Sequence, residues 1–206
     1  MNLLLVLAST SVFSALLYVF IRTRSSARPV EGHFDLDDQD VSRMPDRIRL
    51  MRIDPDVSFV PETMSSMAGQ LCREGFEDAG TFVIDGMPDA KVRLLANRAQ
   101  SMHCTIWNHT LAGSWFEFTC SYPGGNRSTF TTLTGSGFDG SPGHTVTRAP
   151  GTGLLDLYVR ACSERPMGVF MPATAETAAN DFENRYTVWM TWRRAHLPAQ
   201  ERIEAA

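Results

Sequence analysis

The side chains best suited to chemistry lie on one face of a predicted sheet. Aromatic rings alternate there with single charges, a composition typical of recognition surfaces, because rings supply contact area and charges fix orientation. The candidate binding residues are Lys91, Arg93, Trp107, His109, Trp115, Glu117 and Phe130. Three interpretations stay open: this open face receives a protein partner or small ligand, the rings only stabilise a half-exposed sheet, or another segment covers them.

Motifs for catalysis are weak, and we nominate no catalytic residue. Glu117 and His109 are the only acid and base suited to hydrolysis, and nothing in the sequence activates a nucleophile beside them. Residues 135–140 (GSGFDG) match a dinucleotide-binding spacing, but Pro142 and the β-branched residues 145–147 exclude the helix that must follow. We therefore predict a non-catalytic binding module without a cofactor, with a membrane-tethered hydrolase-type enzyme as the alternative.

Metal, redox and nucleic-acid sites are not indicated either. His103 and His109 are separated by about 20 Å along a strand, too far to share one ion. Lys+Arg 19 against Asp+Glu 23 gives a net charge of -4, so no basic surface for nucleic acid is expected. No C-x-x-C pair occurs, and we expect reduced, buried thiols, with two disulfides in an exported domain as the alternative, at Cys72, Cys104, Cys120 and Cys162.

The elements that must position these side chains form an α+β domain. Alternating apolar and polar residues, separated by short turns, predict a roughly six-stranded antiparallel meander. The predicted strands are 80–86, 90–96, 102–109, 114–122, 127–134 and 144–148, with a short additional strand at 48–53. Helical spacing predicts a helix between Pro61 and Gly75, and two more capped by Thr152 and Thr174.

Turn lengths predict which face is the core. Ile106 is expected opposite both Phe118 and Val92, and Thr131 opposite Phe118. The helices should then pack on one face only, over Val83, Val92, Leu94, Cys104, Ile106, Phe116, Phe118, Cys120 and Leu133.

The N-terminal segment predicts a membrane anchor. Residues 3–21 carry no charge and are long enough to span a hydrocarbon core of about 30 Å. Arg22, Arg24 and Arg28 follow it, which favours a single-pass signal anchor in the inner or plasma membrane with the C-terminal domain cytoplasmic. Export after signal cleavage is the alternative.

The expected organisation follows from these segments. Residues 1–28 form the membrane anchor and its basic flank, and residues 29–58 form an acidic linker. The globular domain covers residues 59–197, and a short tail covers residues 198–206.

Overall fold

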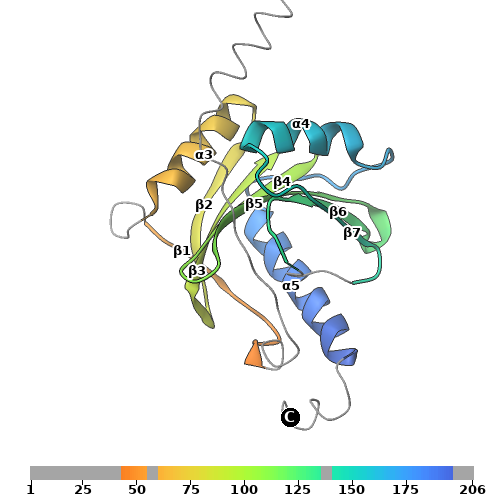
Figure 1. The fold of residues 1–206 in the computed structure, drawn as a ribbon. Helices are drawn as coiled ribbons and strands as arrows, with labels where there is room; N and C mark the ends of the chain where they lie inside the picture. The colour runs from red at the N-terminus through yellow and green to blue at the C-terminus, as the bar shows by residue number, and fades with distance from the viewer. Residues whose placement is uncertain (1–42, 55–59, 136–140, 197–206) are drawn as a thin grey trace, which may run out of the picture.

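A computed structural model describes residues 43–54, 60–135 and 141–196 (Figure 1). It has an α+β fold in which a seven-stranded open sheet combines with three longer helices. The predicted membrane anchor and most of the acidic linker lie outside the described residues. Within the described ranges, no helix has both the length and the apolar character to cross a membrane.

The sheet contains the six predicted strands and also the short additional strand that was predicted within residues 48–53. Its strands follow one another in chain order, and neighbours are antiparallel except for the last pair. The strands are β1 (Leu50–Arg52), β2 (Glu77–Ile84), β3 (Met87–Asn97), β4 (Met102–His109), β5 (Gly113–Ser121), β6 (Arg127–Thr131) and β7 (His144–Arg148).

The meander prediction was wrong at its end, because β6 and β7 are parallel. Arg127 lies beside His144 and Thr131 beside Arg148, so both strands run the same way. Residues 132–143 connect them, which is long enough for the chain to return to the same end of the sheet.

The strand register also differs from the prediction. Ile106 pairs with Phe116, two positions from the expected Phe118, and a shift of two keeps both side chains on the predicted face. Val92, however, pairs with Trp107 instead of Ile106. This one-residue shift places Val92 on the opposite face, because side chains alternate along a strand.

A second one-residue shift occurs between β5 and β6. Phe118 pairs with Phe130, and Thr131 pairs with Glu117. Phe130 therefore points to the same side as Phe118 and belongs to the core. From the sequence it was expected on the opposite face, among the candidate binding residues.

Helices cover both faces of the sheet, which corrects the prediction that they pack on one. Helices α3 (Glu62–Arg73) and α4 (Leu154–Glu164) pack on the face of Phe116 and Phe118. Helix α5 (Ala178–Ala195) packs on the other face, against Trp107 and Trp115. Figure 1 shows the sheet arching over α5, with α3 and α4 on the outer, convex side.

The apolar stripes of these helices explain their placement. Met64, Met67, Ala68 and Leu71 follow helical spacing on α3 and are all buried. The helix ends before Gly75, whose φ of 86° is accessible mainly to glycine. Helix α5 begins after Thr177 instead of the expected Thr174, and its buried residues follow helical spacing: Ala178, Phe182, Tyr186, Trp189 and Met190.

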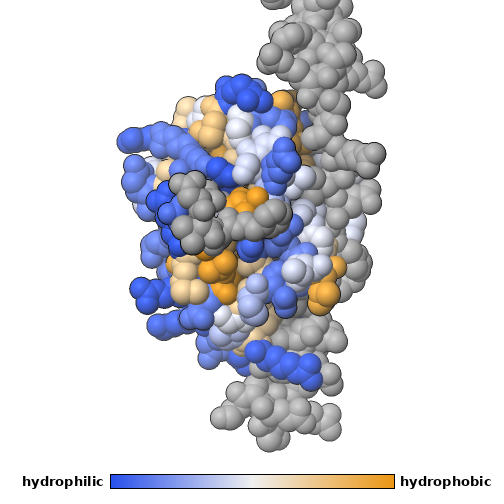
Figure 2. Space-filling model, turned by 90° about the vertical axis from the view of Figure 1, so that its left-hand side faces the viewer, coloured by the Kyte–Doolittle hydropathy of each residue, from blue (hydrophilic) through white to orange (hydrophobic). Residues whose placement is uncertain are grey.

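The outer surface beside α3 and the first strands is largely hydrophilic. Figure 2 shows this side of the molecule, where hydrophobic residues form small separate patches among charged ones. The aromatic residues of the sheet are thus found inside the molecule, between the sheet and its helices.

Candidate functional site

A small cavity lies between α5 and the concave face of the sheet. Its volume is about 70 Å³, enough for about five water molecules. We call it the inner cavity, and it is lined by Thr105, Trp107, Glu117, Thr119, Arg127, Thr129 and His144 from the sheet and by Phe182, Arg185, Tyr186 and Trp189 from α5.

A second, larger hollow adjoins the inner cavity. This outer groove has a volume of about 350 Å³ and lies between the β5–β6 turn and the first half of α5. Met171, Asp181 and Val188 contribute to its walls. Arg127 and Arg185 line both spaces, so the inner cavity and the outer groove meet at these two guanidinium groups.

The two arginines form a partly buried pair of like charges. Burial and, to a smaller extent, the nearby charge of Arg185 lower the pKa of Arg127 to about 10, against the opposing effect of Glu117. Burial also lowers the pKa of Arg185, which Glu117 and Asp181 oppose. A pKa of about 10 leaves Arg127 protonated at neutral pH, so the site holds positive charge in a partly dry environment.

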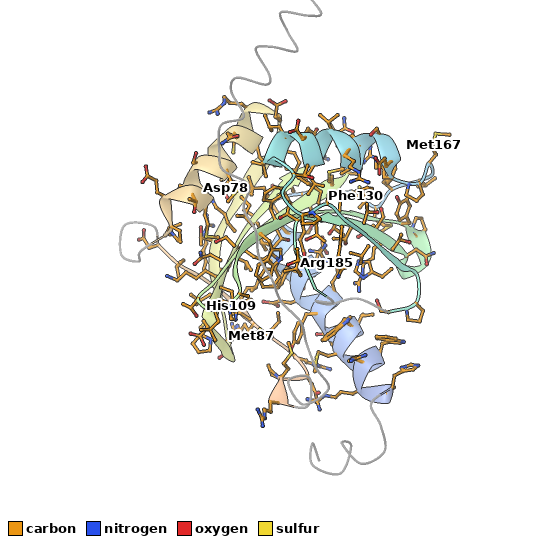
Figure 3. All side chains as sticks on the ribbon, viewed as in Figure 1. Asp78, Met87, His109, Phe130, Met167 and Arg185 are labelled. Carbon is orange, nitrogen blue, oxygen red and sulfur yellow. The ribbon has the colours of Figure 1, made fainter. Side chains whose placement is uncertain are left out.

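Hydrogen bonds fix the charged groups in place. The Glu117 carboxylate accepts from Trp115 Nε1 at 3.3 Å and from Thr131 Oγ1 at 3.5 Å. Arg127 donates to Ser141 Oγ at 3.0 Å. Arg185 donates through Nε to the backbone oxygen of Asp181 at 3.2 Å, one turn earlier in its own helix, and Figure 3 shows it beneath the arch of the sheet.

A chain of hydroxyl groups links one wall of the cavity to a histidine. Thr119 Oγ1 and Thr129 Oγ1 are 3.0 Å apart, and His144 Nε2 lies 2.9 Å from Thr129 Oγ1. Burial lowers the pKa of His144 to about 3, helped by the charges of Arg127, Arg185 and Arg148. His144 is therefore neutral at pH 7, and its buried Nδ1 finds no hydrogen-bond partner within the described part of the chain.

A second histidine borders the outer groove. His103 is buried, and its Nε2 lies 3.6 Å from a carboxylate oxygen of Asp181. Burial lowers its pKa to about 4, and the charge of Arg185 contributes in the same direction, whereas Asp181 opposes it. Among the described residues, no group of three or more His, Cys, Asp or Glu side chains could hold a metal ion.

Three of the candidate residues from the sequence gather at the inner cavity. Trp107 and Glu117 line it, and Trp115 supports both, since its ring stacks on Trp107 at 5.1 Å and its Nε1 donates to Glu117. The expectation that these rings lie on an open face was wrong. Trp107 is 4% exposed and Trp115 is 1% exposed, because α5 covers them.

The other four candidates lie elsewhere. Arg93 and Lys91 point to the convex side, where Arg93 pairs with Asp78 and donates to Ser65 Oγ of α3. Phe130 is a core residue beneath α4 (Figure 3).

His109 sits at the far tip of the sheet (Figure 3), where its Nδ1 accepts from the backbone N–H groups of Leu111 and Ala112. Glu117 lies opposite Thr105 on the neighbouring strand. His109 is four positions beyond Thr105 along that strand, so about 13 Å separate His109 from the position opposite Glu117. The nominated Glu117 and His109 pair is therefore not brought together.

Sequence reasoning missed Arg127, Thr129, His144 and Arg185. One signal was available: Phe182, Arg185, Tyr186 and Trp189 follow helical spacing, so an arginine interrupts an otherwise aromatic stripe. A charge on the buried side of a helix needs a reason, because isolated buried charges are costly. The other three residues could not be found without knowing how β6 and β7 pair.

The expectation of four buried thiols was right for Cys104 and Cys120 and wrong for Cys72. All four cysteines are free, Cys104 and Cys120 are buried, and Cys72 is exposed. Burial raises the pKa of Cys104 and of Cys120, so neither is an activated nucleophile.

Comparison of the chain with protein-family models, curated proteins and solved structures finds no match. The functional argument therefore starts from the geometry of the inner cavity and the outer groove.

Proposed function

We propose that the domain binds a small molecule in the inner cavity, between the concave face of the sheet and α5. The observation that carries this proposal is the convergence of two arginines, one glutamate, one histidine and several threonines on a half-open cavity that also has aromatic walls. Ligand pockets have this composition: apolar walls with a few polar groups that fix orientation. The proposed site is thus a concave cavity instead of the open sheet face expected from the sequence.

A filled cavity tests this proposal directly. Thr105 is buried, lines the inner cavity and lies opposite Glu117. Thr105→Met should occupy the space and abolish ligand binding, whereas Thr105→Val nearly keeps the side-chain shape and serves as the matched control. The full chain in detergent would be screened by ligand-observed NMR against a fragment library containing neutral, anionic and cationic compounds.

Two results would count against the binding proposal. One is that no fragment binds the wild-type chain. The other is that fragments bind Thr105→Met as well as they bind Thr105→Val, with both variants shown to be folded by thermal melts. The expected result is binding to the wild type and to Thr105→Val only.

Hydrolysis remains a second candidate because of one contact. His144 Nε2 lies 2.9 Å from the Thr129 hydroxyl, the spacing of a base beside a nucleophile. The pKa of about 3 makes His144 a weak base, which favours binding over catalysis. Turnover of short nitrophenyl esters that is lost in Thr129→Val and kept in Thr119→Val would favour the enzyme.

We also propose that residues 3–21 tether this domain to the inner or plasma membrane with the C-terminal domain in the cytoplasm. The uncharged stretch and its arginine flank support this orientation. A fluorescent protein fused to the C-terminus should fluoresce in the cytoplasm. Activity of a fused phosphatase that works only after export would instead support the exported alternative.

A further inference from the structure

The charges that line the inner cavity do not balance. Arg127 and Arg185 face one carboxylate, that of Glu117. Asp181 lies outside this lining, in the wall of the outer groove, where its charge also acts on Arg185 and where it accepts from Thr177 Oγ1 at 2.8 Å. The lining of the inner cavity itself therefore holds two guanidinium groups and one carboxylate, and a charge removed from water favours a partner of opposite sign.

The geometry of the positive groups favours a carboxylate. Arginine presents a planar fork of N–H donors that matches the two oxygens of a carboxylate. Arg185 uses its Nε on Asp181 O, and Arg127 uses one terminal nitrogen on Ser141. Each guanidinium has further donors beyond the one engaged in that bond.

The other end of the inner cavity is apolar. The rings of Trp107 and Phe182 are 5.4 Å apart, and Tyr186 and Trp189 complete this wall. The Tyr186 hydroxyl donates to the backbone oxygen of Pro45 at 2.7 Å, so that polar group is engaged outside the ligand site. A ligand with an acidic head at the arginines would place a hydrocarbon tail against these rings.

The size of the cavity limits that tail. A volume of about 70 Å³ corresponds to about five water-sized groups. A short-chain acid fits this space, and a longer molecule would have to extend past the arginines into the outer groove.

We infer that the ligand of the inner cavity is a short-chain monocarboxylate, with its carboxylate at Arg127 and Arg185 and its hydrocarbon part against Trp107 and Phe182. This inference rests on the proposed function, since it names the chemical class of the molecule bound at the same site. It goes further by predicting that charge as well as shape decides what binds.

Three probes of similar size separate charge from shape. Butyrate and butyramide have nearly the same shape but differ in charge, and n-butylammonium carries the opposite charge. Their dissociation constants would be measured by chemical-shift titration of the full chain in detergent. We expect butyrate to bind roughly tenfold more tightly than butyramide, because charge-assisted hydrogen bonds are stronger than neutral ones, and n-butylammonium not to bind.

Substitution of the arginines locates the carboxylate. Arg185→Gln and Arg127→Gln should each weaken butyrate binding by about tenfold or more while changing butyramide binding little. Arg160→Gln is the matched control, because Arg160 pairs with Glu164 on the exposed side of α4, away from the cavity. Thermal melts would establish that each variant is folded, and the comparison of probes on the wild type does not depend on the variants.

The outcomes distinguish the two proposals. Equal or tighter binding of butyramide than of butyrate would overturn the carboxylate inference while leaving small-molecule binding in place. Binding of inorganic phosphate with no binding of butyrate would also overturn it, in favour of a different anion. Failure of every probe and of the whole fragment library would overturn the proposed function itself.

Discussion

The two faces of the sheet are built from the same strands but have different contents. On the convex face, Phe116, Phe118 and Ile106 pack against α3 and α4 in a dry, apolar core. On the concave face, the alternate positions of the same strands hold Thr105, Glu117 and other polar groups under α5. Both faces are covered, so burial alone does not distinguish a structural face from a functional one.

The difference lies in what burial costs on each side. Apolar side chains gain free energy when they leave water, and the buried core on the convex face is built mainly from such side chains. Buried charges lose solvation and are retained only where partners compensate for that loss. The polar groups of the concave face therefore contribute less to stability than the apolar core of the convex face does. We expect residues on the two faces to differ in how substitution and pH change the free energy of unfolding.

Truncation of the convex core should have the largest effect on stability. Phe118 is 0% exposed, and its ring lies 5.9 Å from that of Phe76 and 5.6 Å from that of Tyr158. Phe118→Ala should lower the free energy of unfolding by about 3–5 kcal/mol, because it removes a buried ring and leaves a cavity. Urea titration measures this, with Leu111→Ala, at an 89% exposed site, as the control. A loss below about 1 kcal/mol would mean that this face is not the core.

Trp107→Ala tests the aromatic wall of the concave face. The sequence alone suggested an exposed ring that costs the fold little, but its burial and its stacking on Trp115 reverse that expectation. We expect a loss of about 3 kcal/mol, at the low end for a buried tryptophan because the ring already borders a void. Trp107→Phe should recover most of this loss in the same urea titration. If the urea midpoint of Trp107→Ala equals that of the wild type, the ring is exposed and this face of the sheet is open.

Acid should destabilise the concave face selectively. The pKa values of His103 and His144 in the folded protein are about 4 and about 3, below the ordinary 6.5. At a pH between the folded and the ordinary pKa, each histidine is therefore protonated in the unfolded protein and neutral in the folded one. Stability is complete above pH 6.5 and falls as the pH drops. Between pH 7 and pH 5 each histidine should contribute a loss of about 2 kcal/mol.

Substitution of each histidine measures its share of this pH dependence. His103→Gln and His144→Gln should each flatten the plot of unfolding free energy against pH between pH 7 and pH 5. His196→Gln, at an exposed position after α5, is the control substitution. A plot whose slope is the same in the wild type and in both buried-site variants would argue against neutral, buried imidazoles.

Arg93 should show the smallest effect. Its ion pair with Asp78 is partly exposed, with the two side chains 20% and 28% accessible, and such pairs contribute less than about 1 kcal/mol. Arg93→Gln and Asp78→Asn, alone and together, form a double-mutant cycle that measures the coupling. Neither substitution should change the dissociation constant of butyrate. A change in that constant would indicate that butyrate binds on the convex side of the sheet.

Much of the fold could be predicted because it depends on local patterns. Alternation located six strands, and helical spacing located α3 and the buried stripe of α5. The pairing of residues between strands was harder to predict, because an error of one residue at a turn moves every side chain on the strand to the other face. Val92 and Phe130 were misplaced in this way, although the limits of their strands were nearly right.

The amino-acid sequence by itself determined the fold class, the position of most elements and three of the aromatic and acidic residues at the cavity, Trp107, Trp115 and Glu117. Only the tertiary structure decided that α5 covers the concave face and that β7 lies parallel beside β6. These two features of the packing bring Arg185 and His144 to the same cavity as Glu117 and Arg127, although the four residues are not neighbours in the chain. Local periodicity says which side of an element is buried but not what covers it, because that depends on packing between distant segments.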